Sequence, residues 1–300
     1  MSDDAERFEP HRRMLTRLAY RMLGSAAEAE DVVQDAYLRW HGALARAAVD
    51  ADAAYLRATV TRLALDRLRS ARAARETYVG PWLPEPLLDD AATDPEAVAA
   101  LADDVSFALM LALERLSPLE RAAFLLHDVL DVPFVEIAAT LERSEEAVRQ
   151  LASRAREHVR SARVRRGADH AQALRQRDAF AAALRAGDVG GLMRLLKEDV
   201  VLLADGGGKA RAAVNPLVGP DRVARFLIGV MSKHGASITG VIPVSLNGDP
   251  GFLVLGDEPG YEGLTQTLAI EADAQGIGAI YITRNPDKLR GLAAHLPAAP

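Results

Sequence analysis

Apolar residues recur at every third or fourth position through the first part of the chain, a spacing that is typical of amphipathic helices. The pattern predicts three helices in this part, at about 5–23, 26–46 and 51–73. Gly24 and Ser25 separate the first two, and Ser25 is suited to cap the second. A second helical block runs from about 96 to 163. Its first helix ends near Leu116, and Ser117-Pro118 then supplies a cap and a first-turn proline for the next helix.

The pattern changes after about residue 168. It predicts two helices at about 169–186 and 188–197, a short strand at Val200–Leu203, and a helix at about 219–234. Four strand-like runs follow, at about 237–246, 251–257, 264–273 and 277–284. Turn sequences such as Asn247-Gly248 separate these runs. Helices followed by an antiparallel meander indicate an α+β domain.

The segment from Val132 to Arg156 has the pattern of a helix-turn-helix. A first helix with Phe134, Ile137 and Leu141 on one face is followed by a turn and by Ser144, a good N-cap for a second helix. The outer face of the second helix carries polar and basic side chains: Arg149, Gln150, Ser153 and Arg154. Arginine and glutamine can read base edges in a DNA major groove, so this face favours DNA binding. The alternative is an amphipathic helix pair whose outer face is merely solvated.

Composition limits the class of protein. Three hundred residues suggest two or three domains, and 49% apolar residues are enough for real cores. The absence of cysteine excludes disulfides, thiolate metal sites and cysteine nucleophiles. No apolar run approaches the roughly 20 residues of a membrane span, so no membrane partner is expected. The acidic N-terminus lacks an apolar signal core, which makes a cytoplasmic location the expectation.

The charge is unevenly distributed, and this changes how the net charge of −6 is interpreted. Eight arginines face three glutamates between Arg143 and Arg166, a local net charge of +5. Seven acids and no lysine or arginine lie between Glu85 and Asp104. Local sign matters more for contact with nucleic acid than the total. The proline-rich stretch before the acids predicts a linker, with Trp82-Leu83 as an anchored apolar spot.

Several short motifs in order along the chain resemble extracytoplasmic-function sigma factors that carry a C-terminal SnoaL-like domain. The motifs are Tyr20–Asp35, with Ala29-Glu30-Asp31-Val32-Val33-Gln34-Asp35 at its end, Arg57–Arg69, Leu116-Ser117-Pro118, Trp82–Leu87, Asp205–Lys209 and Asn285–Leu289. The resemblance implies a multidomain fold with two all-α sigma domains and an α+β, NTF2-like cone domain. The implied divisions are sigma region 2 at 5–75, an acidic proline-rich linker at 76–98, sigma region 4 at 99–166 and the SnoaL-like domain at 169–296. Such a protein directs core RNA polymerase to promoter DNA and initiates transcription, is not an enzyme, and needs no cofactor or metal.

The resemblance also implies roles for individual residues. Asp31, Gln34 and Asp35 share one helix face, the expected docking face for the β′ subunit of core polymerase, with the β subunit also a partner. The expected contacts to the downstream promoter element are Thr61, Arg62, Arg67 and Arg69. The expected contacts to the upstream element are Ser144, Arg149, Gln150, Ser153 and Arg154. Glu142 stands where such turns often carry glycine. Glutamate can follow the turn if its backbone avoids positive φ, so we expect a small geometric change rather than loss of binding. The acidic linker either occupies a basic channel of the polymerase or serves as an extended spacer.

Three functions remain open for the C-terminal domain. As an enzyme it would use His234, Asp205 and Asp273, although no spacing makes this set convincing. As a sensor it would bind a small apolar ligand in the cone. As a regulator it would contact the sigma domains, and the motifs favour this function through Trp82, Asp205, Lys209, Asn285, Asp287 and Lys288. The main rival for the whole chain is a one-component regulator that binds a palindromic site as a dimer, without recruiting polymerase.

Overall fold

The computed structural model describes residues 3–45, 51–88, 105–163, 170–261, 263–293 and 296. The chain divides into two units, each built from two stretches of sequence. The first unit is Met1–Thr77 with Met110–Ala162, and the second is Tyr78–Leu109 with Arg163–Pro300. The predicted linker therefore belongs mostly to the second unit, although its residues 89–98 lie outside the described residues.

The N-terminal stretch of the first unit is a bundle of the three predicted helices, α1 (Asp3–Leu23), α2 (Ala26–Leu44) and α3 (Asp52–Glu76). Their apolar faces bury large side chains such as Phe8, Leu15, Trp40 and Leu56. The Ser25 hydroxyl accepts a hydrogen bond from the amide of Glu28 at 3.3 Å, so the predicted cap is confirmed. The hydrophobic spacing thus predicts this bundle correctly.

The second stretch of this unit contains the helix-turn-helix. Its elements are α5 (Phe107–Glu114), whose first residues up to Leu109 belong to the second unit, α6 (Pro118–Phe124), the π-helical turn η1 (Leu125–Val129), α7 (Phe134–Leu141) and α8 (Glu145–Arg163). Ser117 and Glu120 form a reciprocal capping box at the start of α6, with Pro118 in its first turn. The predicted helix pair α7–α8 is confirmed, whereas the π-helical turn is not visible in the hydrophobic pattern.

The condition that the backbone of Glu142 avoids positive φ is not met. This residue ends α7 in the left-handed conformation, with φ 55° and ψ 49°. The amide of Arg143 then bonds to the carbonyl of Ala138 at 3.1 Å, which closes the end of the helix. The turn adopts a positive φ at position 142. This backbone conformation is strained for glutamate, which has a Cβ atom, and would be unstrained for glycine.

The second unit is an α+β domain, as predicted. Its helices are α9 (His170–Ala186), α10 (Val189–Leu195), α11 (Pro220–His234), the 3-10 turn η2 (Gly235–Ser237) and α12 (Pro286–Ala293). Its strands are β1 (Leu196–Asp205), β2 (Leu217–Val218), β3 (Ile238–Leu246), β4 (Asp249–Gly256), β5 (Leu264–Asp273) and β6 (Gly276–Thr283). The strand order is β2-β1-β6-β5-β4-β3, with β1 parallel to β6 and every other pair antiparallel.

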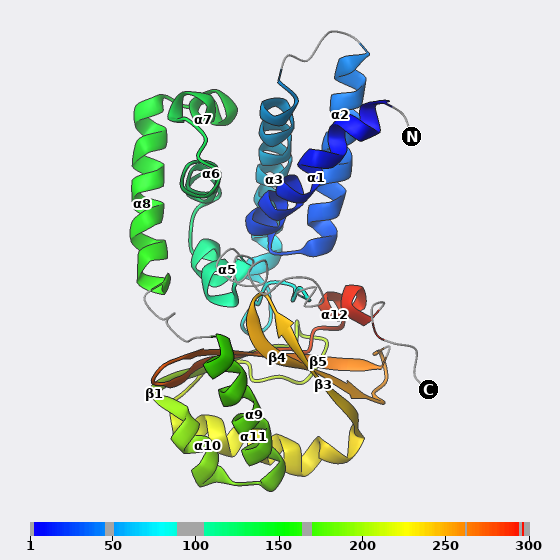
Figure 1. The fold of residues 1–300 in the computed structure, drawn as a ribbon, viewed down its shortest axis with the longest axis vertical. Coiled ribbons are helices and arrows are strands. Elements are labelled where there is room, and N and C mark those ends of the chain that lie inside the picture. The colour runs from blue at the N-terminus through cyan, green and yellow to red at the C-terminus, as the bar shows by residue number, and fades with distance from the viewer. Residues whose placement is uncertain are drawn as a thin grey trace. The chain divides into compact units, whose positions relative to one another are not determined.

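The helices α9, α10 and α11 lie together on one face of the sheet (Figure 1). The core between them is made of Phe180, Phe252 and aliphatic side chains that include Leu192, Ile270 and Ile280. The four-strand meander is confirmed, and the predicted strand at Val200–Leu203 extends through the whole of β1. Among the described residues, no helix is both long and apolar enough to cross a bilayer.

The composition of the Asn285-Pro286-Asp287-Lys288 motif predicts a turn with a charged face, and this prediction is wrong because the motif begins helix α12. The Asn285 side chain accepts from the amide of Asp287 at 3.1 Å, and Pro286 opens the helix. Asparagine caps and first-turn prolines are common at both turns and helix starts, so the motif alone does not separate them. Leu289 and Leu292 on α12 are buried.

Candidate functional sites

The predicted polymerase-docking face lies on the exposed side of α2. Asp31, Gln34 and Asp35 are all exposed there, one helical turn apart. Leu38 continues the same face and is 57% exposed, an unusual position for a large apolar side chain. The sequence analysis did not include Leu38, although its spacing of seven from Asp31 places it on this face. The face therefore combines two carboxylates, one amide and one large apolar side chain, that of Leu38.

Arg67 of α3 lies beside these acids. Its guanidinium is 3.3 Å from the carboxylate of Asp35 and 3.6 Å from that of Asp31, and it donates to the carbonyl of Glu28 at 2.9 Å. The structure thus groups Arg67 with the α2 acids rather than with the other α3 arginines. Its positive charge partly balances the face on which the two acids lie.

The remaining α3 residues that were predicted to contact DNA have different environments. Arg62 is exposed and donates to the carbonyls of Ala139 and Thr140, at 3.3 and 3.2 Å, which caps the C-terminus of α7. Arg69 is exposed and pairs with Asp66 one turn away. Thr61 is fully buried and its hydroxyl bonds to the carbonyl of Arg57 at 2.8 Å, so its side chain is not available to DNA here. A threonine inside a helix can return its hydroxyl to the preceding turn, as Thr61 does, and its contact with DNA stays a prediction.

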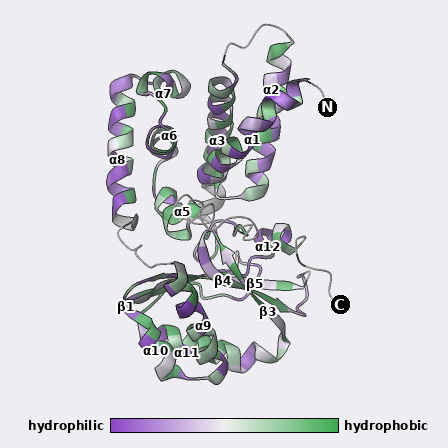
Figure 2. Ribbon diagram, in the orientation of Figure 1, coloured by the Kyte–Doolittle hydropathy of each residue, from purple (hydrophilic) through white to green (hydrophobic). Residues whose placement is uncertain are grey.

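The outer face of α8 presents the predicted basic and polar side chains, and the alternation of apolar and polar residues along the helix is visible in Figure 2. Arg149, Gln150, Ser153 and Arg154 are all exposed. Arg149 pairs with Glu145 and lies 4.5 Å above the ring of Phe134, which fixes its direction. The hydroxyl of Ser144 accepts from the amide of Ala147 at 3.2 Å, so this residue caps α8 as expected.

Arg121 of α6 follows the Leu116-Ser117-Pro118 motif and has a structural role that the sequence did not predict. It is buried, and its guanidinium bonds to the carbonyls of Met22 and Leu113 at 2.6 and 2.8 Å and to Glu114 at 2.7 Å. Met22 and Leu113 lie in the last turns of α1 and α5, where carbonyls have no donor within the helix, and the Leu113 carbonyl also accepts from the amide of Leu116 at 3.1 Å. One cation therefore ends two helices and joins the two parts of the first unit.

Asp205, at the end of β1, is the centre of a buried polar cluster in the second unit. Its carboxylate accepts from the hydroxyl of Tyr78 at 2.6 Å, from the amide of Leu83 at 2.9 Å and from the ammonium of Lys288 at 2.7 Å. Its backbone carbonyl accepts from the amides of Arg284 and Asn285. Asp205 is fully buried, so these donors replace the water that a free carboxylate would bind. The cluster fixes the linker to the domain.

The residues around Asp205 complete this cluster. The ammonium of Lys288 lies 4.3 Å above the ring of Trp82 and also donates to the carbonyl of Leu83. The amide of Asn285 donates to the hydroxyl of Tyr78 at 2.9 Å. Lys209 and Asp287 form an exposed ion pair at the edge of the cluster. All six residues predicted to be regulatory therefore meet in one place.

The glycines of the Asp205–Lys209 motif allow the close approach of α12. Gly207 has a φ of +59°, and a Cβ atom on it would lie 2.3 Å from the side-chain nitrogen of Asn285. A side chain at this position would push Asn285 away from Tyr78. The Asp205–Lys209 and Asn285–Leu289 motifs thus pack directly against each other, which explains the glycine at position 207 and the asparagine at position 285.

Tyr78 belongs to the same cluster and was missed in the sequence. Burial raises the pKa of its hydroxyl well above the usual range, and the hydrogen bond and negative charge of Asp205 raise it further. The hydroxyl is therefore protonated at neutral pH and donates its hydrogen bond to Asp205. No sequence signal marks this tyrosine, because its partner is more than a hundred residues away.

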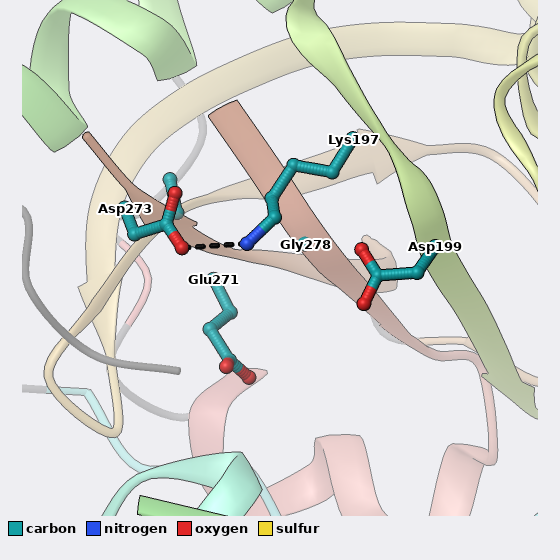
Figure 3. A pocket seen from close by; sticks show the side chains of 6 residues that line it. Lys197, Asp199, Glu271, Asp273 and Gly278 are labelled. Atoms are coloured by element: carbon teal, nitrogen blue, oxygen red, sulfur yellow. Dashed lines mark hydrogen bonds and ion pairs between the residues drawn. The ribbon is translucent and has the colours of Figure 1, made fainter. Parts of the chain in front are cut away.

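The three ionisable residues considered for catalysis have separate partners. Asp205 is taken up by the linker cluster, while Asp273 bonds to the ammonium of Lys197 at 2.7 Å in a small recess also lined by Asp199 and Glu271 (Figure 3). Burial alone would raise the pKa of Asp273, but Lys197 and backbone amides lower it. His234 is exposed at the end of α11. The structure gives no arrangement in which these three act together.

Two protein-family models match the chain, one on each of its two helical parts. The family model for Sigma-70 region 2 matches residues 7–74, and the model for Sigma-70, region 4 matches residues 106–159. These matches define the class as a sigma-70 type transcription initiation factor. Each match falls on the helices that carry the predicted polymerase and DNA contacts.

Relatives that match nearly the whole chain define the family. ECF RNA polymerase sigma factor SigJ of Mycobacterium tuberculosis is 41% identical over 299 residues, covering 96% of this chain and 94% of the relative. Probable ECF RNA polymerase sigma factor SigI of the same species is 33% identical over 291 residues, covering 95% and 94%. The crystal structure of SigJ aligns with a TM-score of 0.76 at 38% identity, covering 96% of this chain and 98% of that one. The chain belongs to the extracytoplasmic-function sigma factors.

Proposed function

We propose that this sigma factor docks on core RNA polymerase through the α2 face, reads promoter DNA through α8 and α3, and is regulated by its α+β domain through the linker. Sigma factors of this family recognise promoters and initiate transcription. The proposal adds the residues that carry each step. The protein acts in the cytoplasm, where the polymerase and its DNA template are found.

The docking step rests on the exposed face of Asp31, Gln34, Asp35 and Leu38. The carboxylates suit basic side chains on the polymerase, of which the β′ subunit is the expected partner and β a second one. Such charges mainly steer association and fix the register of docking. Leu38 supplies apolar area that an ion pair alone lacks.

The DNA-binding step rests on α8, and its exposed polar and basic face within a helix-turn-helix is the observation that carries the proposal. Arg149, Gln150, Ser153 and Arg154 suit the upstream element as duplex DNA. Arg62 and Arg69 suit the downstream element. No dimer or palindromic site is needed, since polymerase holds both DNA-binding parts.

The regulatory step rests on the cluster around Asp205, which joins the linker to the α+β domain. A change in this domain would reach the two sigma regions through the chain that connects them. The apolar core between the sheet and its helices is the place where a small apolar ligand would act. In this proposal the domain regulates transcription and performs no bond chemistry of its own.

The DNA-binding step is tested with polymerase holoenzyme assembled from the full chain and a promoter fragment that it transcribes. Arg154→Ala should weaken binding to this fragment about 5- to 150-fold, the equivalent of one lost base contact of roughly 1–3 kcal/mol. Arg185→Ala, which removes an exposed arginine from α9, should leave binding unchanged. Equal affinities of the two variants would contradict the assignment of α8.

A further inference from the structure

Asn247 occupies an unusual environment for a hairpin turn. It joins β3 to β4 with a φ of +53°, and Gly248 follows with a φ of +78°. Asn-Gly is the preferred pair for such a two-residue turn, where the asparagine side chain is normally exposed. Here Asn247 is fully buried. The turn therefore meets another part of the chain.

That part of the chain is the linker, which Asn247 holds at two separate places. Its side-chain oxygen accepts from the amide of Leu87 at 2.8 Å, and its side-chain nitrogen donates to the carbonyl of Val105 at 2.8 Å. Its own backbone amide donates to the carbonyl of Leu87 at 2.9 Å, beside a single β-bridge between Leu88 and Leu246. One carboxamide thus joins positions on either side of the segment 88–104. We call these contacts the Asn247 clasp.

A ring contact supports the clasp on the side of Val105. Phe107 stacks on Tyr281 of β6 with ring centroids 5.0 Å apart and planes 16° apart. The Tyr281 hydroxyl donates to the buried carboxylate of Glu271 at 2.6 Å, which fixes the ring on the sheet. Val105 and Phe107 are both buried. The returning end of the linker is therefore packed as well as hydrogen-bonded.

The clasp strongly limits the reach of the linker. Eighteen residue steps separate Leu87 from Val105 and could span ~60 Å at roughly 3.3–3.6 Å per residue when extended. Two bonds of 2.8 Å to one carboxamide hold the Leu87 nitrogen and the Val105 oxygen within about 8 Å of each other. The lost reach of ~50 Å corresponds to about fifteen base pairs of duplex at 3.4 Å each.

The linker must lengthen if the two sigma regions separate, and the first unit gives a reason why they do. Arg62, a predicted DNA contact on α3, caps α7 of the helix-turn-helix through the carbonyls of Ala139 and Thr140. Arg62 can contact DNA only after it leaves α7. Breaking these two bonds removes one contact that holds α3 against α7, which favours separation of the two regions.

We propose that the Asn247 clasp sets the reach of the linker and must open before the two sigma regions engage polymerase and promoter together. This proposal rests on the proposed function. The α+β domain then acts on transcription by holding or releasing this clasp. Asn247 is a positioning residue in this scheme, since it acts through the linker and contacts no DNA.

A reversible disulfide tests the proposal, because the chain contains no cysteine. The bond from the Asn247 amide to the Leu87 carbonyl makes Leu88 and Leu246 a pair of the non-hydrogen-bonded kind, with Cα atoms about 4.5 Å apart, which suits a disulfide. The double variant Leu88→Cys/Leu246→Cys is assayed in full-length protein for run-off transcription with core polymerase, oxidised and after reduction. We expect loss of transcripts when oxidised and recovery when reduced.

The matched control is Val201→Cys/Val218→Cys, an equivalent pair between β1 and β2. Its transcripts should be the same oxidised and reduced. Transcripts from the reduced Leu88→Cys/Leu246→Cys protein would support the proposed function. If neither the reduced variant nor the unmodified protein gave transcripts, the proposed function itself would be contradicted. Full transcription by the oxidised variant, with its disulfide verified by mass spectrometry, would overturn the clasp proposal.

A second variant tests the clasp without a disulfide. Asn247→Gly keeps the positive φ that the turn needs and removes both side-chain bonds. Hydrogen exchange should show loss of protection at the Leu87 amide, while transcription should stay equal to that of the unmodified protein or exceed it. Gln275→Gly, at the exposed turn between β5 and β6, should change neither. Retained protection at Leu87, or transcription lost in Asn247→Gly alone, would also overturn the proposal.

Discussion

Asp205 and Lys288 show how much a single buried charge can depend on its partners. Asp205 is fully buried, and Lys288 is 12% exposed between two aromatic rings. Removing one partner of such a pair leaves the other as an unbalanced charge in a poorly polar site. Lys209 and Asp287 lie nearby and form an ion pair that is largely exposed. The two lysines therefore allow a direct comparison of buried and exposed pairing.

Lys288→Met should lower the free energy of unfolding of the second unit by about 3–5 kcal/mol, since it strands the Asp205 carboxylate. Lys209→Met, the matched control, should cost about 0–1 kcal/mol because water already screens that pair. Urea denaturation followed by circular dichroism measures both. Adding Asp205→Asn to Lys288→Met should cost less than the sum of the two single changes. Additive losses would show that the pair is not coupled.

At the scale of elements, the helix-turn-helix contains one local conflict between sequence and backbone. Glu142 adopts the left-handed conformation at the end of α7, although it carries a Cβ atom. That conformation costs a residue with a side chain roughly 1–2 kcal/mol. The turn is kept because Arg143 closes it by bonding to Ala138 and Ser144 caps the following helix.

Glu142→Gly should raise the free energy of unfolding of the first unit by about 0.5–1 kcal/mol, the relieved strain less the entropy that glycine loses on folding. Glu146→Gly, in the first turn of α8, should lower it by about 1 kcal/mol, since glycine is a poor helix residue. Thermal unfolding of the full-length variants measures both. Destabilisation by Glu142→Gly would contradict the role given to this backbone conformation.

Elements with a long, regular apolar spacing were predictable from the sequence, and those set by local bonding were not. The helices α1 to α3, the pair α7–α8 and the meander β3 to β6 follow from periodicity alone. The π-helical turn η1 and the two-residue β2 are too short to show a period, and the Asn285-Pro286 start of α12 suits a turn as well as a helix. Their geometry depends on packing against distant residues.

The same limit applies to the sites. Asp31, Gln34 and Asp35, and the outer face of α8, are predictable because spacing along one helix fixes which residues share a face. Tyr78, Arg121 and Asn247 are not, because each acts through partners distant in the chain. The burial of Thr61 could not be predicted either, because a motif marks the type of residue and not its exposure.

At the scale of the whole molecule, two helical regions that belong to a sigma factor are joined by a linker that packs on an α+β domain. The domain holds the linker through Asp205 at one place and through Asn247 at two others. Regulation can therefore act on the connection between the regions without blocking either surface. We propose above all that the chain initiates transcription by binding polymerase through the α2 face and promoter DNA through α8.

Run-off transcription with purified core polymerase tests this claim most directly, on the chain's own upstream region and on a pool of genomic fragments. The full-length protein should yield defined transcripts that depend on its addition. Asp31→Arg/Asp35→Arg should abolish both these transcripts and binding to core polymerase, while Glu9→Arg, at an exposed acid on α1, should preserve them. No transcript from any template, together with no binding of the unmodified protein to core polymerase, would contradict the account.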